Sequence, residues 1–378
     1  EWPNPVIELP GNRGEDASLD RRLDEIIEKV APCSAQSAPA LSRLVPLFEH
    51  GFLRESECQN LARKIWGADE YQKLPEIGLL SSVLLELPSE NPAAVKALVR
   101  RHLFQADDGV LFDASRLADI ARAGQLKGAR ELPSKDEAKR YFDRMVSWRA
   151  KHRDNDILGF TEREEKRVGE LIGTALAHSV VPALSSMALT EEAFEKLNGF
   201  YAEVHSPEAI RAFPCFAVHN AGFSDRVETA LRQALRNKDA NCVAHASYAL
   251  LRWRELNDSP ATGRLLTILV AQIGSNRIPG LAALLWTANQ MYNKGYLSAS
   301  DTDSLIEMLP VLFDADYGSI PARSREAVST SLVRAACVRL ARDILNTHSI
   351  KNDGLLRVLE EAREDALPEV RFAEITDA

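Results

Sequence analysis

Apolar residues recur every three or four positions along most of this 378-residue chain, and this spacing constrains its fold more than any other feature. Within residues 225–235, for example, Val227, Leu231 and Leu235 fall on one face of a helix. The alternation of apolar and polar residues that is typical of β-strands is nearly absent, and the best strand candidate is the short segment 107–114. We therefore predict an all-α fold.

One stretch contains the pattern of a complete helix pair. A helix predicted over 225–237 is followed by the polar turn "NKD" and by a second helix over 240–257, which buries Val243 and Leu250. The pair takes about 33 residues, a length typical of helical repeats. The phrase "DALPEVRFA" (365–373) is similar to the turn of HEAT-like repeats, in which Asp caps, Pro opens the helix and Val faces the core. These features predict stacked antiparallel helix pairs in an irregular HEAT-like α-solenoid.

Changes in composition divide the chain into four segments. A stretch rich in Pro and Gly, 1–17, is expected to be an extended entry segment. Helical patterns then fill an N-terminal helical subdomain, 18–152, and a C-terminal HEAT-like helical-repeat subdomain, 161–378. The polar segment 153–160 is the expected linker. Because the chain begins at Glu1 rather than Met, we also expect it to be part of a longer protein.

Charge, hydropathy and cysteine usage exclude several classes of partner. The 46 basic and 55 acidic side chains give a net charge of −9, which disfavours nucleic acid and anionic membranes as partners. No apolar run reaches the roughly 20 residues that a membrane-spanning helix needs. The cysteines are scattered and form no CxxC pair, which is typical of a reducing cytoplasm and predicts neither a zinc site nor a disulfide. They are Cys33, Cys58, Cys215, Cys242 and Cys337.

The common motifs of catalysis and cofactor binding are not found. The sequence has no Walker or GxGxxG phosphate loop, no HExxH or G-x-S-x-G motif, and no EF-hand loop. We therefore predict no catalytic residue, no cofactor and no metal site. One enzyme hypothesis stays open, in which distant residues such as His178, His219 and Glu195 converge on a site.

Cys242 and His245 lie three residues apart on the second helix of the pair, so they could meet on its surface. A metal would need further ligands, and no second pair of such residues lies nearby. We interpret Cys242 as a small core residue and His245 as a partly buried or surface histidine. Both are then parts of a scaffold.

Two segments, "RMVSWRAKHR" and "LLRWRELN", combine Trp with Arg, residue types that are enriched at recognition hot spots. In the alternative interpretation each Trp faces inward and each Arg lies on the solvated face. If these segments bind a partner, the acidic surroundings favour a protein over single-stranded nucleic acid. Together with two tyrosines of the loop-like segment "NQMYNKGYLS", the candidate protein-interaction residues are Trp148, Arg149, Arg252, Trp253, Arg254, Tyr292 and Tyr296.

Two further segments together resemble a known family. Residues 54–88 run from a helix through Trp and an acidic turn to "LP" and a closing "LLELP", and "EAREDALPEVRFA" (361–373) lies near the end. This combination resembles the large C-terminal helical region of bacterial sirtuin-like anti-phage defence proteins, in which an NAD-cleaving domain precedes a long helical sensor. The Gly-rich loop and the catalytic Asn and His of a sirtuin domain have no counterpart here, so no catalytic residue carries over.

The resemblance implies a non-catalytic sensor or regulatory module in the bacterial cytoplasm. Such a module would recognise a protein partner, for example a phage protein, and control an effector enzyme that lies outside this chain. An NAD-cleaving domain is the effector that the family implies. The alternative is a generic α-solenoid scaffold that mediates oligomerisation.

Overall fold

A computed structural model describes Leu117, Ile120 and residues 133–148, 162–204, 206–275, 280–317, 330–348 and 352–374. Every element in these residues is helical and none of them forms a strand, so the all-α prediction is confirmed for the described part of the chain. The strand candidate at 107–114 lies outside that part. No helix within the described ranges has both the length and the apolar character needed to cross a bilayer.

The chain divides into two compact units, Glu1–Ala138 and Lys139–Ala378. Nearly all of the described residues belong to the second unit. The predicted entry segment, 1–17, and the predicted linker, 153–160, lie outside the described residues, as does most of the predicted N-terminal subdomain.

Most of the described residues lie in helices. The long helices are α7 (Lys135–Val146), α9 (Glu162–Ala175), α10 (Glu191–Val204), α12 (Ser224–Leu235), α13 (Ala240–Leu256), α14 (Pro260–Ile273), α15 (Leu281–Asn293), α16 (Ala299–Asp314), α18 (Thr330–His348) and α19 (Asp353–Arg363). The short elements are η6 (Leu176–Val180), η7 (Val181–Ala183), η8 (Ser186–Ala188), η9 (Pro207–Ala212), α11 (Pro214–His219), η10 (Ala221–Phe223) and α20 (Pro368–Arg371).

Capping side chains explain where several helices begin. The Asp239 carboxylate accepts hydrogen bonds from the backbone N–H groups of Asn241, at 2.7 Å, and Cys242, at 3.1 Å, and so starts α13. The Asn352 side chain accepts one from the backbone of Leu355 at 3.0 Å and starts α19. Each cap satisfies an amide that the first helical turn leaves unpaired, which stabilises a helix by about 1 kcal/mol.

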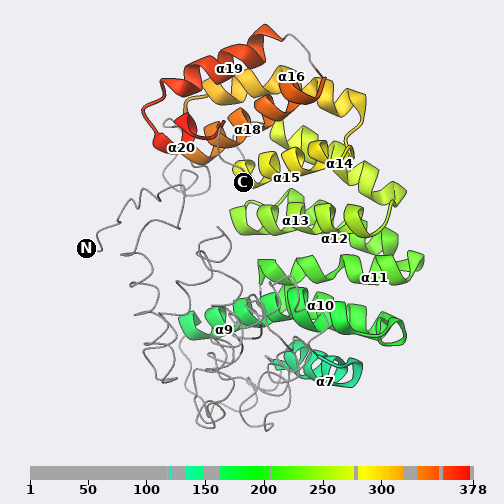
Figure 1. The fold of residues 1–378 in the computed structure, drawn as a ribbon. Coiled ribbons are helices and arrows are strands. Elements are labelled where there is room, and N and C mark those ends of the chain that lie inside the picture. Colours follow the sequence, from blue (N-terminus) through cyan, green and yellow to red (C-terminus); the bar gives the residue numbers. More distant parts are fainter. Residues whose placement is uncertain are drawn as a thin grey trace, which may run out of the picture. The chain divides into compact units, whose positions relative to one another are not determined.

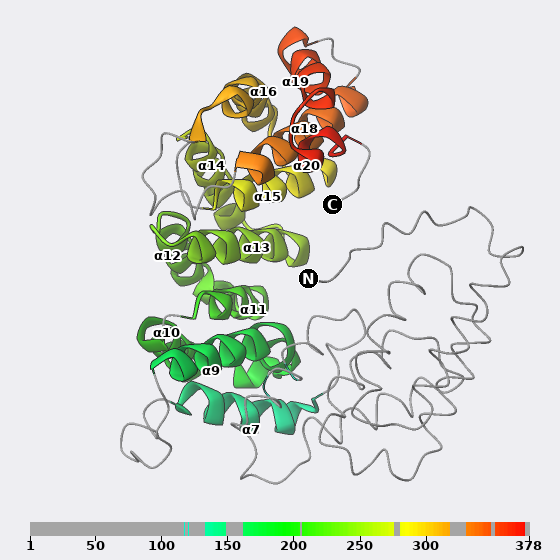
Figure 2. The same ribbon diagram turned by 90° about the vertical axis from the view of Figure 1, so that its left-hand side faces the viewer.

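The helices from α12 onward pack in two rows. The first row consists of α12, α14 and α16, and the second row of α13, α15 and α18 (Figure 1). Each first-row helix also packs on the helix that follows it in the second row, so α12 pairs with α13, α14 with α15, and α16 with α18. Figure 2 separates the rows, with the first row on the left. Helix α19 packs against the last pair.

Apolar side chains fill the space between the rows. Val243, Ala246 and Leu250 of α13 are buried, as the helical spacing predicts. Trp253 of the same helix is completely buried and is among the largest side chains in the core. Burial of a side chain of this size contributes several kcal/mol to folding, so the pairs are held together mainly by this core.

A buried carboxylate joins two helices of the first row. The Glu228 side chain of α12 is 5% exposed and accepts hydrogen bonds from Arg264 Nε of α14 at 3.1 and 3.0 Å. Arg232 also pairs with it. The hydrogen bonds from Arg264 are the main reason that the pKa of Glu228 is lowered, although burial alone would raise it. The Glu228 carboxylate is therefore ionised, and the two arginines balance its charge.

The segment 365–373 near the end of the chain forms a turn followed by a short helix, whose N-cap is Leu367 rather than Asp365. Asp365 Oδ1 accepts a hydrogen bond from the Leu367 backbone at 2.8 Å, Pro368 opens α20, and Val370 is fully buried. Arg334 Nη2 of α18 lies 2.8 Å from Asp365 Oδ2. The ion pair therefore attaches this turn to the second row.

Candidate protein-binding groove

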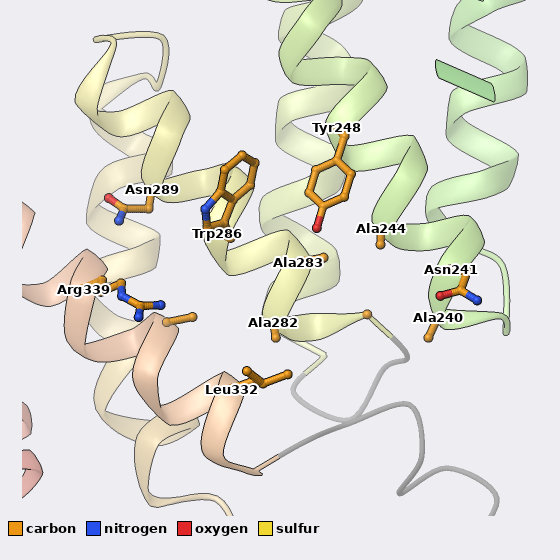
Figure 3. Close-up of a pocket in the computed structure, with 12 residues that line it drawn as sticks. Ala240, Asn241, Ala244, Tyr248, Ala282, Ala283, Trp286, Asn289, Leu332 and Arg339 are labelled. Carbon is orange, nitrogen blue, oxygen red and sulfur yellow. The ribbon is translucent and has the colours of Figure 1, made fainter. Parts of the chain in front are cut away.

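The second row carries a half-open groove with a volume of about 360 Å³, at the small end of the range of about 300 to 1,000 Å³ that is typical of binding pockets. It lies on α13, α15 and α18 (Figure 3). The lining residues, which define the groove, are Ala240, Asn241, Ala244, Tyr248, Gly280, Ala282, Ala283, Trp286, Asn289, Leu332, Ala336 and Arg339. Five of them are alanines, whose short side chains leave the space open.

A glycine allows the groove to form where α15 begins. Gly280 precedes α15 with a φ of +73°, a left-handed conformation that other residues rarely adopt. A Cβ atom at this position would lie 3.0 Å from the carbonyl oxygen of Ala240 and 3.1 Å from the side chain of Val243. Gly280 therefore brings the starts of α13 and α15 together on one side of the groove.

Polar contacts fix the three helices that line the groove. Between α13 and α15, the buried hydroxyl of Thr287 donates a hydrogen bond to Ser247 Oγ at 2.9 Å. Between α15 and α18, Asn293 Nδ2 donates to Asp343 Oδ2 at 2.8 Å. Because the Thr287–Ser247 pair is buried and buried polar groups need specific partners, it sets how α13 and α15 are aligned, whereas the Asn293–Asp343 contact is exposed. The groove is thus built on rigid elements.

Aromatic and aliphatic side chains form its walls. The rings of Tyr248 and Trp286 meet edge to face, with centroids 5.3 Å apart, and both side chains are partly exposed. Leu332 of α18 is 57% exposed, an unusual position for a large aliphatic side chain. Figure 3 shows these three side chains on three different helices around the alanines.

The groove also contains hydrogen-bond donors. The Asn289 side chain is 4% exposed, and its Oδ1 accepts a hydrogen bond from Asn293 Nδ2 at 3.3 Å. Its own Nδ2 has no hydrogen-bond partner in the described part of the chain, and Arg339 presents a guanidinium group on the neighbouring helix. None of the lining residues is His, Cys, Asp or Glu. The groove is therefore suited to hold apolar side chains and peptide carbonyl groups.

Cys242 and His245 lie beside the groove, on another strip of α13. Burial raises the pKa of the Cys242 thiol, so this residue stays protonated and unreactive at neutral pH. Burial and the nearby Arg211 lower the pKa of His245 to about 4, and its Nε2 lies 3.5 Å from Glu208 Oε1. Both observations support the interpretation of this pair as scaffold residues.

Two of the candidate tryptophans lie in the core rather than on a surface. Trp148 is 2% exposed and Trp253 is 0% exposed, since both positions fall on the apolar stripe of their helices. The inward alternative for these tryptophans is therefore confirmed. Tyr292, at 8% exposed, is also buried. Arg149 lies outside the described residues.

The remaining candidates lie on the second row but outside the groove. Arg254 pairs with Asp258, and its guanidinium carbon lies 5.2 Å from the centre of the partly exposed Tyr296 ring. Arg252 Nη1 lies 3.9 Å from Glu255 Oε2. These groups stabilise the ends of α13 and α15.

The residues of the enzyme hypothesis come from three separate elements. Glu195 of α10 pairs with Arg226, His219 is exposed at the end of α11, and His178 belongs to η6. In the ranges that the structure describes, no three residues of the types His, Cys, Asp and Glu are grouped as metal ligands would be.

In the part of the chain that the structure describes, the fold is all-helical and an apolar groove lies on one row of its helices. No family model, curated protein or solved structure matches the chain.

Proposed function

We propose that this chain is a non-catalytic recognition module that binds a protein partner through the groove on its second row. The packing of consecutive helix pairs in two rows supports an irregular HEAT-like α-solenoid. Such arrays present a long continuous surface on one row of helices, and protein partners commonly bind there.

The exposure of Leu332 beside the groove is the observation that carries this proposal. A leucine that is 57% exposed, next to the partly exposed rings of Trp286 and Tyr248, leaves apolar surface in water. Clustered exposed apolar groups mark sites of protein interaction, and tryptophan and tyrosine are frequent anchors there. The surrounding polar groups would orient the bound segment.

The resemblance to sirtuin-like defence proteins suggests the biological setting. We infer that the module acts in the bacterial cytoplasm as a sensor for a phage protein. Binding would control an effector enzyme, such as an NAD-cleaving domain, that this chain does not contain. The absence of acidic, His or Cys side chains from the groove fits a role in binding rather than in catalysis.

Two matched substitutions test the proposal. Leu332 in the groove is 57% exposed, and Val311 of the first-row helix α16 is 59% exposed. The tagged protein is co-expressed with individual phage structural proteins, and each partner that copurifies is titrated against L332D and V311D. We expect L332D to weaken binding by roughly a hundredfold, because it places a charge against an apolar contact, and V311D to leave binding unchanged.

Equal binding by L332D and by the unmodified protein would contradict the proposal. The same experiment addresses the scaffold alternative, because light scattering reports the mass of each variant. If the only partner is a second copy of this chain, and L332D reduces the mass to that of one chain, the groove serves oligomerisation instead.

A further inference from the structure

Arg211, on η9, lies close to the groove and has no carboxylate partner among the residues that the structure describes. Its guanidinium carbon is 5.4 Å from the centre of the Tyr248 ring, on which it rests. Within the described part of the chain it makes no hydrogen bond or ion pair. Burial lowers the pKa of Arg211, which shows that its charge is partly removed from water. A partly desolvated cation of this kind favours an anion as partner.

The charged groups around Arg211 leave it in a positive environment. Arg252 lies one helical turn after Tyr248 on α13, and its positive charge lowers the pKa of Arg211 further. Glu208 has the opposite effect, but its oxygens lie against Ser206 Oγ, at 3.0 Å, and His245 Nε2, at 3.5 Å. The neighbouring His245 is neutral at pH 7. Arg252 has its own carboxylate, Glu255, at 3.9 Å, and Glu208 is already engaged, so Arg211 is the arginine of this group that lacks a direct carboxylate contact in the described chain.

Other arginines of the described chain contrast with Arg211. Those that directly contact a carboxylate include Arg226, Arg232, Arg254, Arg264, Arg334, Arg357 and Arg363. Arg167, Arg236 and Arg371 also make no such contact in the described chain, but they are exposed to water, whereas Arg211 is half-buried.

Tyr248 connects Arg211 to the groove. One side of its ring faces the Arg211 guanidinium, at 5.4 Å, and Trp286 lies 5.3 Å away from the same ring. Because both groups contact the same ring, they lie no more than about 11 Å apart, and an extended peptide, which advances about 3.3 Å per residue, spans this with about three residues. A single short segment can therefore reach both.

We propose that the groove binds an extended acidic segment of the partner protein, with an Asp or Glu carboxylate on Arg211 and an apolar side chain, about three residues away, between Trp286 and Leu332. This inference rests on the proposed function, since it names the chemistry of the partner at the same groove. The carboxylate fixes the position of the segment, and the apolar side chain fills the space above the alanines.

A library of random peptides of about twelve residues, displayed on particles and selected on the immobilised full chain, tests this proposal. We expect the enriched peptides to carry Asp or Glu about three residues from Leu, Phe or Trp. R211Q should lose the acidic preference and bind the selected peptides roughly tenfold more weakly, as expected for one charge-assisted contact. R211K keeps the charge and should retain the preference. R357Q removes a positive charge that is paired with Asp314, away from the groove, and should bind as the unmodified protein does.

The variants also separate failure of this inference from failure of the proposed function. In one outcome L332D no longer binds the selected peptides, but R211Q selects the same acidic sequences as the unmodified protein. The proposal of an acidic segment on Arg211 is then refuted, and the proposal that the groove binds a protein partner is retained. If L332D selects the same peptides too, or no peptide is enriched, both proposals are refuted. Binding of a single-stranded oligonucleotide in place of peptides, with strong weakening by salt, would likewise overturn the choice of a protein segment.

Discussion

The two rows of helices present chemically different surfaces. In the first row the charges are matched, since Glu228 is held by Arg232 and Arg264. Each row has a strongly exposed aliphatic side chain, Val311 in the first row and Leu332 in the second, and both rows have ion pairs. Leu332 differs because it lines the groove beside Trp286, and Arg211 of η9, which packs against α13, has no carboxylate partner in the described chain. Clustered apolar groups and an unmatched charge are typical of binding surfaces. The difference indicates that the second row, together with η9, is the side available for binding.

Two tryptophans test this division most strongly, because one is in the core and the other borders the groove. W253A should reduce the free energy of unfolding by about 4 kcal/mol, since it leaves a large cavity between the rows. W286A, at a partly exposed position, should reduce it by only about 1 kcal/mol and should weaken partner binding instead. Chemical denaturation of both variants measures the two costs.

A loss of stability in W286A as large as that in W253A would contradict the division, since Trp286 would then be a structural residue. W286F serves as a control, because it keeps an aromatic ring against Tyr248 and should recover most of the stability.

The pH dependence of stability should also distinguish the rows. His245, beside the groove, has its pKa lowered from 6.5 to about 4 in the folded chain, so the unfolded chain binds protons more readily between these values. The free energy of unfolding should therefore fall by about 2 kcal/mol between pH 7 and pH 5. Glu228, in the first row, also has a lowered pKa, and its contribution to stability is lost only at lower pH, near and below the ordinary glutamate pKa of 4.5.

Urea denaturation of the unmodified protein and of H245Q at pH 7, 6 and 5 checks this expectation. In H245Q the decrease over this range should largely disappear. A decrease that is unchanged in H245Q would show that another group is responsible. E228Q provides the control, because it should alter the free energy of unfolding without changing how that free energy depends on pH between pH 7 and pH 5.

Much of the fold could be predicted because helical spacing and capping act locally. The helix predicted at 240–257 matches α13 to within one residue, and the predicted burial of Val243 and Leu250 is confirmed. Trp253 falls on the same apolar face of the helix, which explains why the interpretation that it points into the core is correct. Its flanking arginines are typical of binding sites, but the helical period turns them away from the tryptophan.

The groove could be predicted only in part. On α15, helical spacing places Trp286 with Ala282, Ala283 and Asn289, away from the leucines of the core, and this small-residue face around a tryptophan is visible in the sequence. The partner residue Leu332, however, lies on α18, more than forty positions later. Its position beside Trp286 depends on which helices pack together in the second row, and local spacing does not specify that.

Arg211 could not have been identified from the sequence. It belongs to η9, a short helical element between two prolines, where no long apolar stripe indicates which side chains face outward. Its lack of a carboxylate partner also depends on Glu208, which contacts Ser206 and His245 instead. The environment of Arg211 therefore depends on how η9 packs against α13, which the local sequence does not specify.

Hydrogen–deuterium exchange with a bound partner or selected peptide tests the central claim most directly. We predict that binding slows amide exchange in α13, α15 and α18, which carry the groove, and leaves exchange in α12, α14 and α16 unchanged. Protection confined to the first row, with none on the second, would contradict the assignment of the groove as the binding surface.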